Sequence, residues 1–202
     1  MTPAAAPAPG VLNLTRELET VVAHIVRSVE ELSHIDPGRV LLCVSSTRSG
    51  GVGGMYAKIH PLRFPGGMRS SEHRRGRHTY VSTMPTVVHR DAEILYVIYF
   101  LLPRFFDLPL REKLVTIFHE LYHISPAFDG DIRRFPGRNF AHGSSTRRYN
   151  AHMARLVDAY LAAHDTPSLL SFMEGTMAEL RTRHRVLVGR RLPVPRIRTE
   201  RR

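Results

Sequence analysis

Apolar residues spaced three or four positions apart predict a helix near the start of the chain. The pattern runs from Asn13 to Ser33, with Asn13 as the capping residue and Asp36-Pro37-Gly38 as the turn that ends it. Continuous apolar runs follow, and such runs are typical of buried strands. We expect strands at "RVLLCVSS", "YAKIHPLRF" and "EILYVIYF", the last at the centre of a sheet, and a further short strand within "HTYVSTMPTVV".

Helical spacing returns in the second half of the chain. One helix is expected over residues 107–124, because Pro126 cannot continue it. A second is capped by Ser144 or Ser145, and a third extends over residues 166–180. "HRVLVGRRLPV" is suited to a final edge strand. A helix and strands followed by helices favour an α+β fold over a doubly wound sheet.

Composition narrows the class of protein. With 202 residues, of which 43% are apolar, the chain suits one domain with a substantial core. The single cysteine, Cys43, excludes a disulfide framework within the chain and a four-cysteine zinc ribbon, and its apolar surroundings indicate a buried thiol. No apolar run approaches the roughly 20 residues of a membrane span, and the first ten residues do not resemble a signal peptide. We therefore expect a cytoplasmic protein with no membrane contact.

The net charge of +11 is concentrated near the end of the sequence. Residues 181–202 hold nine arginines and one acid, Glu200, which gives 9 − 1 = +8. We divide the chain into a disordered leader (1–10), a domain (11–180) and an Arg-rich strand or tail (181–202). The tail is suited to bind nucleic acid through phosphates, and the alternative is a solvated terminus. Residues 66–78 are expected to form a basic loop, whose histidines His73 and His78 are more typical of an exposed surface than of a metal site.

The motif "HELYH" carries the clearest chemical signal. On a helix, His119 and His123 lie four residues apart on one face, so both imidazoles can bind one ion about 2 Å away. Glu120 lies beside that face, where it can reach a metal-bound water without ligating the ion. Zn²⁺ lowers the pKa of such a water towards 7, and the carboxylate accepts its proton. The apolar residues around the motif indicate a buried helix, in which these polar groups are costly unless paired or metal-bound.

A catalytic zinc needs a third protein ligand and an open fourth position. Four residues are candidates: Asp129, Glu174, His152 and His142. Asp129 has the spacing of a metzincin ligand, but Pro126 occupies the position where that pattern needs glycine. Glu174 lies near the apolar face of the last helix, and His152 is more typical of a core histidine. We favour His142, because Gly143 allows a sharp turn that can bring the next helix against the HELYH helix.

The stretch "HELYHISPAFDGDIRR…AHG" resembles the phage metallopeptidase family, in which HELxHI is followed by a Phe-x-Gly element and a His-Gly pair. Phe128-Asp129-Gly130 and His142-Gly143 match these positions, and the resemblance covers about residues 39–163. More distantly, the pattern is similar to SprT-like proteases, in which the histidine of the His-Gly pair is the third zinc ligand. Their C-terminal zinc ribbon cannot be built with one cysteine.

The resemblance implies a zincin-like fold, in which a small mixed sheet has an edge strand above the HELYH helix. It implies Zn²⁺ on His119, His123 and His142, with Glu120 as general base and later general acid. A substrate peptide would lie in extended form along that edge. Tyr149 is the candidate donor to the oxyanion, with packing in the core as the alternative, whereas Tyr122 points away from the ligand face.

Two hypotheses about function remain at this point. The first is a zinc-dependent peptidase that acts on a protein or peptide. The second is a nucleic-acid-binding protein with a structural or inactive zinc site, in which the Arg-rich tail and the 69–78 segment carry the function.

Overall fold

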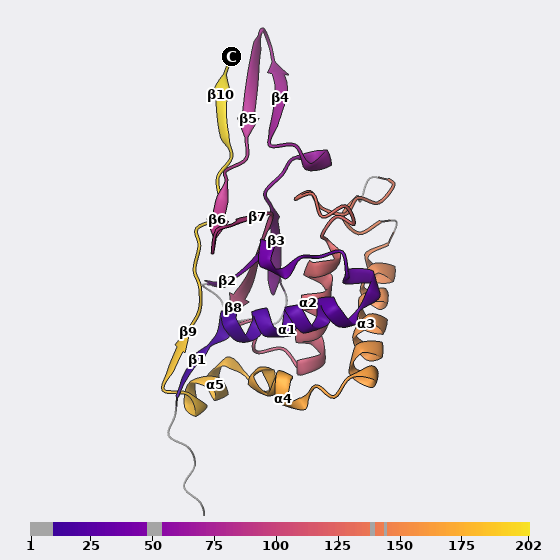
Figure 1. The fold of residues 1–202 in the computed structure, drawn as a ribbon, viewed down its shortest axis with the longest axis vertical. Coiled ribbons are helices and arrows are strands. Elements are labelled where there is room, and N and C mark those ends of the chain that lie inside the picture. The colour runs from indigo at the N-terminus through magenta and orange to yellow at the C-terminus, as the bar shows by residue number, and fades with distance from the viewer. Residues whose placement is uncertain (1–9, 48–53, 138–139, 144) are drawn as a thin grey trace, which may run out of the picture.

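The computed structural model describes residues 10–47, 54–137, 140–143 and 145–202. Figure 1 shows helices gathered around one small sheet and a second sheet that extends away from them. The strands are β1 (Val11–Asn13), β2 (Val40–Ser46), β3 (Ala57–Pro61), β4 (Ser70–Arg75), β5 (His78–Thr83), β6 (Val87–His89), β7 (Ala92–Ile94), β8 (Tyr96–Leu102), β9 (Val186–Val188) and β10 (Arg198–Arg201). The α-helices are α1 (Leu14–Ser28), α2 (Leu110–Tyr122), α3 (Thr146–Ala163), α4 (Pro167–Leu170) and α5 (Met177–Arg183). The 3₁₀ turns are η1 (Glu30–Leu32), η2 (Pro37–Arg39), η3 (Pro65–Gly67) and η4 (Ser171–Met173).

The central sheet is mixed and has the strand order β2-β8-β3. Strand β8 pairs in parallel with β2 and antiparallel with β3, so β8 is central, as the sequence predicts. Alternate residues face opposite sides of a sheet. Leu42 and Ile98 belong to the main core formed with the helices, whereas Leu41, Cys43 and Val97 belong to a smaller cluster on the other face. The predicted α+β fold is therefore confirmed at the level of class.

The helix expected at the start of the chain is present. Asn13 Oδ1 accepts a hydrogen bond from Arg16 N (3.2 Å), so Asn13 is the cap that the sequence indicates. Helix α1 ends at Ser28, and the remaining predicted residues form η1. The helix carrying the HELYH motif is also present as α2, with His123 as its C-terminal cap residue. None of the helices in the described ranges has the length and apolar character needed to span a bilayer.

The prediction of one helix over residues 166–180 is wrong. This region contains α4, η4 and α5, with a break at Glu174 and Gly175. Gly175 has φ +87°, which no continuous right-handed helix allows. Thr176 then begins α5 in a capping box with Glu179, in which each side chain accepts from the other residue's backbone N–H.

The prediction of a loop over residues 66–78 is also wrong. Residues 70–75 form β4, which pairs antiparallel with β5 across the two-residue turn Gly76-Arg77. Strand β10 pairs with the other edge of β5, which gives the order β10-β5-β4. We call this three-stranded sheet the arm. Figure 1 shows that the arm extends away from the helices, with the C-terminus beside it.

The glycine-rich stretch "TRSGGVGGM" after β2 predicts a hairpin or a mobile loop, but it falls largely outside the described residues, because residues 48–53 are not described. Strands β2 and β3 lie on opposite sides of β8 and do not pair with each other. No hairpin therefore joins these two strands.

A long segment crosses the molecule before it reaches the arm. We call residues 186–197 the strap. It begins as β9, which pairs in parallel with β1. The strand predicted within residues 184–194 is thus present only over Val186–Val188, and β10 rather than β9 is the last strand. It then follows the second face of the central sheet, where Arg190 O accepts from Val44 N (2.8 Å) and Leu192 packs on the small cluster. The strap and the β6–β7 hairpin together cover the face of the sheet that the helices leave open.

Candidate metal centre

Three histidines from two separate segments meet beside α2. His119 and His123 lie near the end of α2, and His142 lies just before α3. Their ligand nitrogens all lie within 4.8 Å of one another, and no other metal-compatible group of three occurs in the described part of the chain. Nε2 of His119 and Nε2 of His142 are 3.2 Å apart. The structure thus brings together the three residues that the sequence singled out.

The backbone between His142 and α3 turns as expected. Gly143 has φ +71°, a conformation that favours glycine. Ser145 is the cap of α3, because its side chain accepts from Arg148 N (3.3 Å), whereas Ser144 lies outside the described residues. The turn directs α3 along α2, and this contact holds His142 against the HELYH helix.

Burial makes the imidazoles of α2 uncharged. Desolvation, together with the charge of His142, lowers the pKa of His119 to about 4. Desolvation and the neighbouring His119, His142 and Arg133 lower the pKa of His123 to about 3. Neutral imidazole is the form that ligates metal ions, so no proton has to be displaced at neutral pH.

Glu120 lies in a nearly dry position between α2 and the central sheet. Its side chain is 7% exposed, and desolvation raises its pKa to about 7. The backbone N–H of Ile59 on β3 partly offsets that rise. A buried carboxylate with a pKa near neutrality can both accept and donate a proton at that pH.

Tyr149 packs against all three imidazoles. Its ring stacks on His123 at 5.5 Å and contacts His119 and His142 edge-on at 4.9 and 5.0 Å. Its hydroxyl donates to the backbone carbonyl of His119 (3.3 Å), and burial raises its pKa. In this geometry Tyr149 supports the site by packing, and its hydroxyl would have to leave that carbonyl before it could reach a substrate.

Tyr122 is not part of the histidine group, and its ring contacts that of Tyr149 at 5.6 Å. The Arg133 guanidinium lies 4.1 Å above its ring, and its ring contacts His152 edge-on at 5.3 Å. These contacts agree with the structural role expected for Tyr122.

The other candidate ligands lie elsewhere. His152 faces Glu31, with Nε2 and Oε2 2.9 Å apart, so it forms a surface contact rather than the core contact expected of it. Asp129 Oδ1 accepts from the backbone of Asp131 (3.1 Å), and Glu174 is exposed beside Gly175. None of these three belongs to the histidine group.

The structure explains why the element Phe128-Asp129-Gly130 ends in glycine. Gly130 has φ +90°, and a Cβ atom there would lie 2.4 Å from Arg63 Cγ. Its N–H donates to the Tyr96 hydroxyl (2.9 Å), which itself donates to Asp131 O (2.8 Å). This loop therefore fixes the chain that leaves α2 onto the central strand β8, and only glycine fits there.

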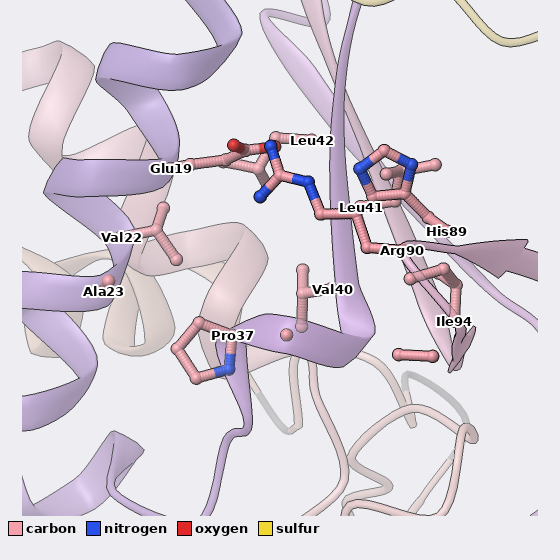
Figure 2. Close-up of a pocket in the computed structure, with 12 residues that line it drawn as sticks. Glu19, Val22, Ala23, Pro37, Val40, Leu41, Leu42, His89, Arg90 and Ile94 are labelled. Carbon is pink, nitrogen blue, oxygen red and sulfur yellow. The ribbon is translucent and has the colours of Figure 1, made fainter.

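A hollow of about 470 Å³ opens beside the histidines. It is bounded by the start of β3, by α2 and by α3, and both His119 and Glu120 line it. A second hollow of about 320 Å³ lies between α1, β2 and the β6–β7 hairpin and contains none of the candidate site residues (Figure 2). In Figure 2 the side chains of Glu19 and Arg90 point toward one another across it. Only the first hollow offers access to the metal-compatible group.

One residue of the site was missed by sequence reasoning. Asn150, on α3, lines the same hollow, and its side chain partly offsets the lowering of the His119 pKa. A polar neighbour of this kind can help to orient a ligating histidine. Nothing local in "RRYNAHM" indicates this contact, since it depends on how α3 packs on α2.

A comparison with known protein families identifies the family of this chain. The family model described as "Putative phage metallopeptidase" matches residues 13–161, which is most of the sequence. The chain belongs to this family. No curated protein and no solved structure matched it. The matched region contains the three histidines, Glu120 and Tyr149, so the family of metallopeptidases and the metal-compatible group coincide in one region of the fold.

Proposed function

We propose that this protein is a zinc-dependent peptidase whose metal is held by His119, His123 and His142. The observation that carries the proposal is the meeting of three imidazoles beside a buried carboxylate, Glu120, in a chain of a metallopeptidase family. Three protein ligands and one open position are typical of catalytic zinc sites.

The donor set fits zinc. Bonds of about 2.0–2.1 Å in a tetrahedral arrangement require ligand nitrogens about 3.4 Å apart. The 3.2 Å between His119 Nε2 and His142 Nε2 is close to this value, and all the ligand atoms are within 4.8 Å. Small side-chain rotations close the remaining difference. A bound Zn²⁺ would supply Lewis-acid polarisation of the water and of the scissile carbonyl.

Glu120 is the group that moves the proton. We assign it the role of general base, which accepts a proton from the attacking water and then donates it to the leaving amine. Its raised pKa of about 7 suits both steps near neutral pH. The backbone N–H of Ile59 on β3 favours the charged form of this carboxylate.

Strand β3 is the proposed platform for the substrate. It is an outer strand of the central sheet, pairs with β8 on one side, and borders the hollow that His119 and Glu120 line. A peptide in extended form can add to such an edge through its backbone. This arrangement supports a zincin-like organisation, in which the peptide passes between the edge strand and the metal-bearing helix.

Tyr149 remains the candidate donor to the oxyanion. Its hydroxyl lies close to the imidazoles but is bonded to the His119 carbonyl. Tyr149→Phe separates the two roles, because phenylalanine keeps the packing and removes the donor. An oxyanion donor predicts a fall of about 10²-fold or more in kcat, whereas a packing role predicts little change.

The activity is tested with Glu120→Gln. Both proteins are loaded with zinc and incubated with a library of peptides from a digested proteome, and new termini are counted by mass spectrometry. Cleavage is expected in the wild type, a loss of at least 10³-fold in Glu120→Gln, and full activity in the exposed control Glu30→Gln. Equal cleavage by wild type and Glu120→Gln would refute the role assigned to Glu120.

The ligands are tested by elemental analysis. About one zinc per chain is expected in the wild type and in His73→Ala, a control on the arm, and a sharp loss is expected in His142→Ala. Zinc retained in His142→Ala would show that His142 is not the third ligand. Wild-type protein without zinc, after expression with zinc supplied, would refute the metal site itself.

A further inference from the structure

The arm sorts its side chains onto two different faces. Residues opposite each other in antiparallel strands share a face, and the faces alternate along each strand. His73 lies opposite Tyr80, which lies opposite Arg201, and Arg75 lies opposite His78. We call the face with His73, Arg75, His78, Tyr80 and Arg201 the basic face.

The opposite face of the arm carries Glu72, Arg74, Arg198, Glu200 and Arg202, and we call it the paired face. Arg202 Nη1 forms an ion pair with Glu72 Oε1 (2.7 Å), and Arg198 Nη2 with Glu200 Oε1 (2.6 Å). Both pairs connect residues of this face, which agrees with the register. Two of its three arginines are therefore already matched by carboxylates.

The basic face has no acidic residue among its positions on β4, β5 and β10. Its remaining positions are serines and threonines, and the Ser82 and Thr199 hydroxyls lie 2.9 Å apart near its base. The side chains of Arg75 and Arg201 are exposed and have no carboxylate on their own face. Their charges are thus available to a ligand that approaches from this side.

An aromatic surface lies between these arginines. The rings of His73 and Tyr80 are stacked, with centroids 5.7 Å apart and an interplanar angle of 17°. His73 is exposed and Tyr80 is half-buried, although both lie on a sheet that extends into solvent. Six-residue strands such as β4 and β5 span about 20 Å, which is enough for several nucleotides.

We propose that the basic face of the arm binds single-stranded nucleic acid. Arg75 and Arg201 contact the phosphates, and the His73–Tyr80 stack offers an outer ring face on which an unpaired base stacks. An acidic peptide would match the arginines but would leave the aromatic pair without a role. Paired bases in a duplex present their edges and not their faces, so the stacking contact favours a single strand.

The basic face combines two segments that lie far apart in the sequence. Strands β4 and β5 lie near the middle of the sequence and β10 near residue 200, and the basic face gains Arg201 only when β10 pairs with β5. It does not depend on the peptidase function, because none of its residues lies in the histidine group.

The experiment measures binding of the full-length, zinc-loaded protein to a labelled 12-nucleotide single strand of mixed sequence by fluorescence anisotropy. Arg75→Gln/Arg201→Gln is expected to weaken binding at least tenfold in 50 mM salt. It should also reduce the slope of log K against log salt by about 1.4, since each phosphate contact on a single strand contributes about 0.7. The matched control Arg74→Gln/Arg198→Gln makes the same change of charge on the paired face and should weaken binding less than threefold.

The aromatic contact is tested separately. Tyr80→Leu is expected to weaken binding at least fivefold without changing the salt slope, and Tyr80→Phe should retain wild-type affinity. Circular dichroism and thermal melts establish that each variant is folded. DNA and RNA strands of the same sequence are compared, and binding of either supports the proposal.

Three results would overturn the proposal. The first is equal weakening by the two double variants, which would mean that only total charge matters. The second is a duplex of the same length bound as tightly as the single strand. The third is competition by poly-aspartate as effective as competition by the unlabelled strand, which would identify a general anion surface.

Discussion

The metal-centre region and the arm differ in where they place their ionisable groups, which are buried around α2 and exposed on the arm. Around α2, burial lowers the pKa of His119 to about 4 and raises that of Glu120 to about 7, so the groups tend to be neutral. On the arm the arginines are exposed to solvent, and the register of the strands determines which face each occupies. Chemistry on a substrate needs groups with shifted pKa values, whereas recognition of a polyanion needs ordinary charges in a defined place.

A carboxylate connects the arm with the rest of the molecule. Glu93, on β7, accepts from Arg63 (2.6 Å), which lies outside the arm, and from Arg69 (2.9 Å), which immediately precedes β4. Arg39 lies 3.8 Å away. These arginines lower the pKa of Glu93. The base of the arm is thus held by a partly buried charge network that combines features of both regions.

Removal of zinc is expected to have the largest effect, and only on the part of the molecule outside the arm. At a free zinc concentration of about 1,000 times the Kd of the site, bound zinc adds about 4 kcal/mol to the free energy of unfolding. A chelator is expected to remove this contribution. The reason is that the ion stabilises only the folded arrangement of the three histidines. Urea titration with and without metal measures this.

The arm supplies the comparison for that experiment. Affinity of the zinc-free protein for the 12-nucleotide strand should change less than twofold at a temperature where it remains folded. Loss of binding on removal of zinc would show that the two regions are coupled. A wild type equally stable with and without metal would contradict a zinc site.

Glu93→Gln is expected to have the next largest effect, a loss of about 3 kcal/mol in the free energy of unfolding. The substitution leaves the Arg63 guanidinium, which is 6% exposed, without its carboxylate. Glu72→Gln on the arm is the matched control and should cost less than about 1 kcal/mol, because its ion pair with Arg202 is exposed. Equal losses in chemical denaturation would contradict this contrast.

Lys113 is expected to make the free energy of unfolding depend on pH, which is not expected of an arginine on the arm. It is fully buried, donates to Met173 O (2.7 Å) and Gly175 O (2.6 Å), and desolvation lowers its pKa from 10.5 to about 8. Between pH 8 and 10.5 the unfolded state therefore binds more protons, so stability rises with pH in this window. The difference in unfolding free energy between wild type and Lys113→Met should change by about 2 kcal/mol from pH 7.5 to 9.5, in favour of the wild type.

The control is Arg75→Met, for which the same difference should stay constant, since arginine does not titrate in this range. A constant difference for Lys113→Met as well would mean that the lysine is no harder to charge in the folded protein than in the unfolded chain.

The smallest effect is expected from Asn150→Ala. Loss of its interaction with the His119 side chain would leave the imidazole freer to rotate, so zinc affinity should fall about tenfold, or about 1.4 kcal/mol. Competition with a chromogenic chelator measures the affinity. Arg147→Ala, an exposed change on the same helix, should leave it unaltered, and an equal fall in both would remove the special role of Asn150.

The sequence predicted the metal region better than the arm, for a physical reason. His119 and His123 are related by helical spacing, and His142 is followed by a glycine and a capped helix, so each feature has a local signal. The pairing of β10 with β5 joins residues more than 100 positions apart, and no local pattern encodes it. Strand β4 is polar on both faces, so the alternation that reveals a half-buried strand is missing.

Other errors had signals that were present but overlooked. The break between α4 and α5 is marked by Gly175 and by the capping box that Thr176 makes with Glu179. In contrast, the contact of Asn150 with His119 depends on the packing of two helices, and propensity says nothing about it.

The strap has a consequence for the order in which the protein can be completed during synthesis. A growing chain reaches residue 186 only after α1, the central sheet and the HELYH helix have all been made. Until then β1 lacks its partner β9, Leu41 and Cys43 lack the cover of Leu192, and β5 lacks one neighbour. The nascent protein would therefore expose an apolar sheet face and an open strand edge, which are the features that chaperones recognise and that favour aggregation. One short segment of chain closes all three openings at nearly the same moment.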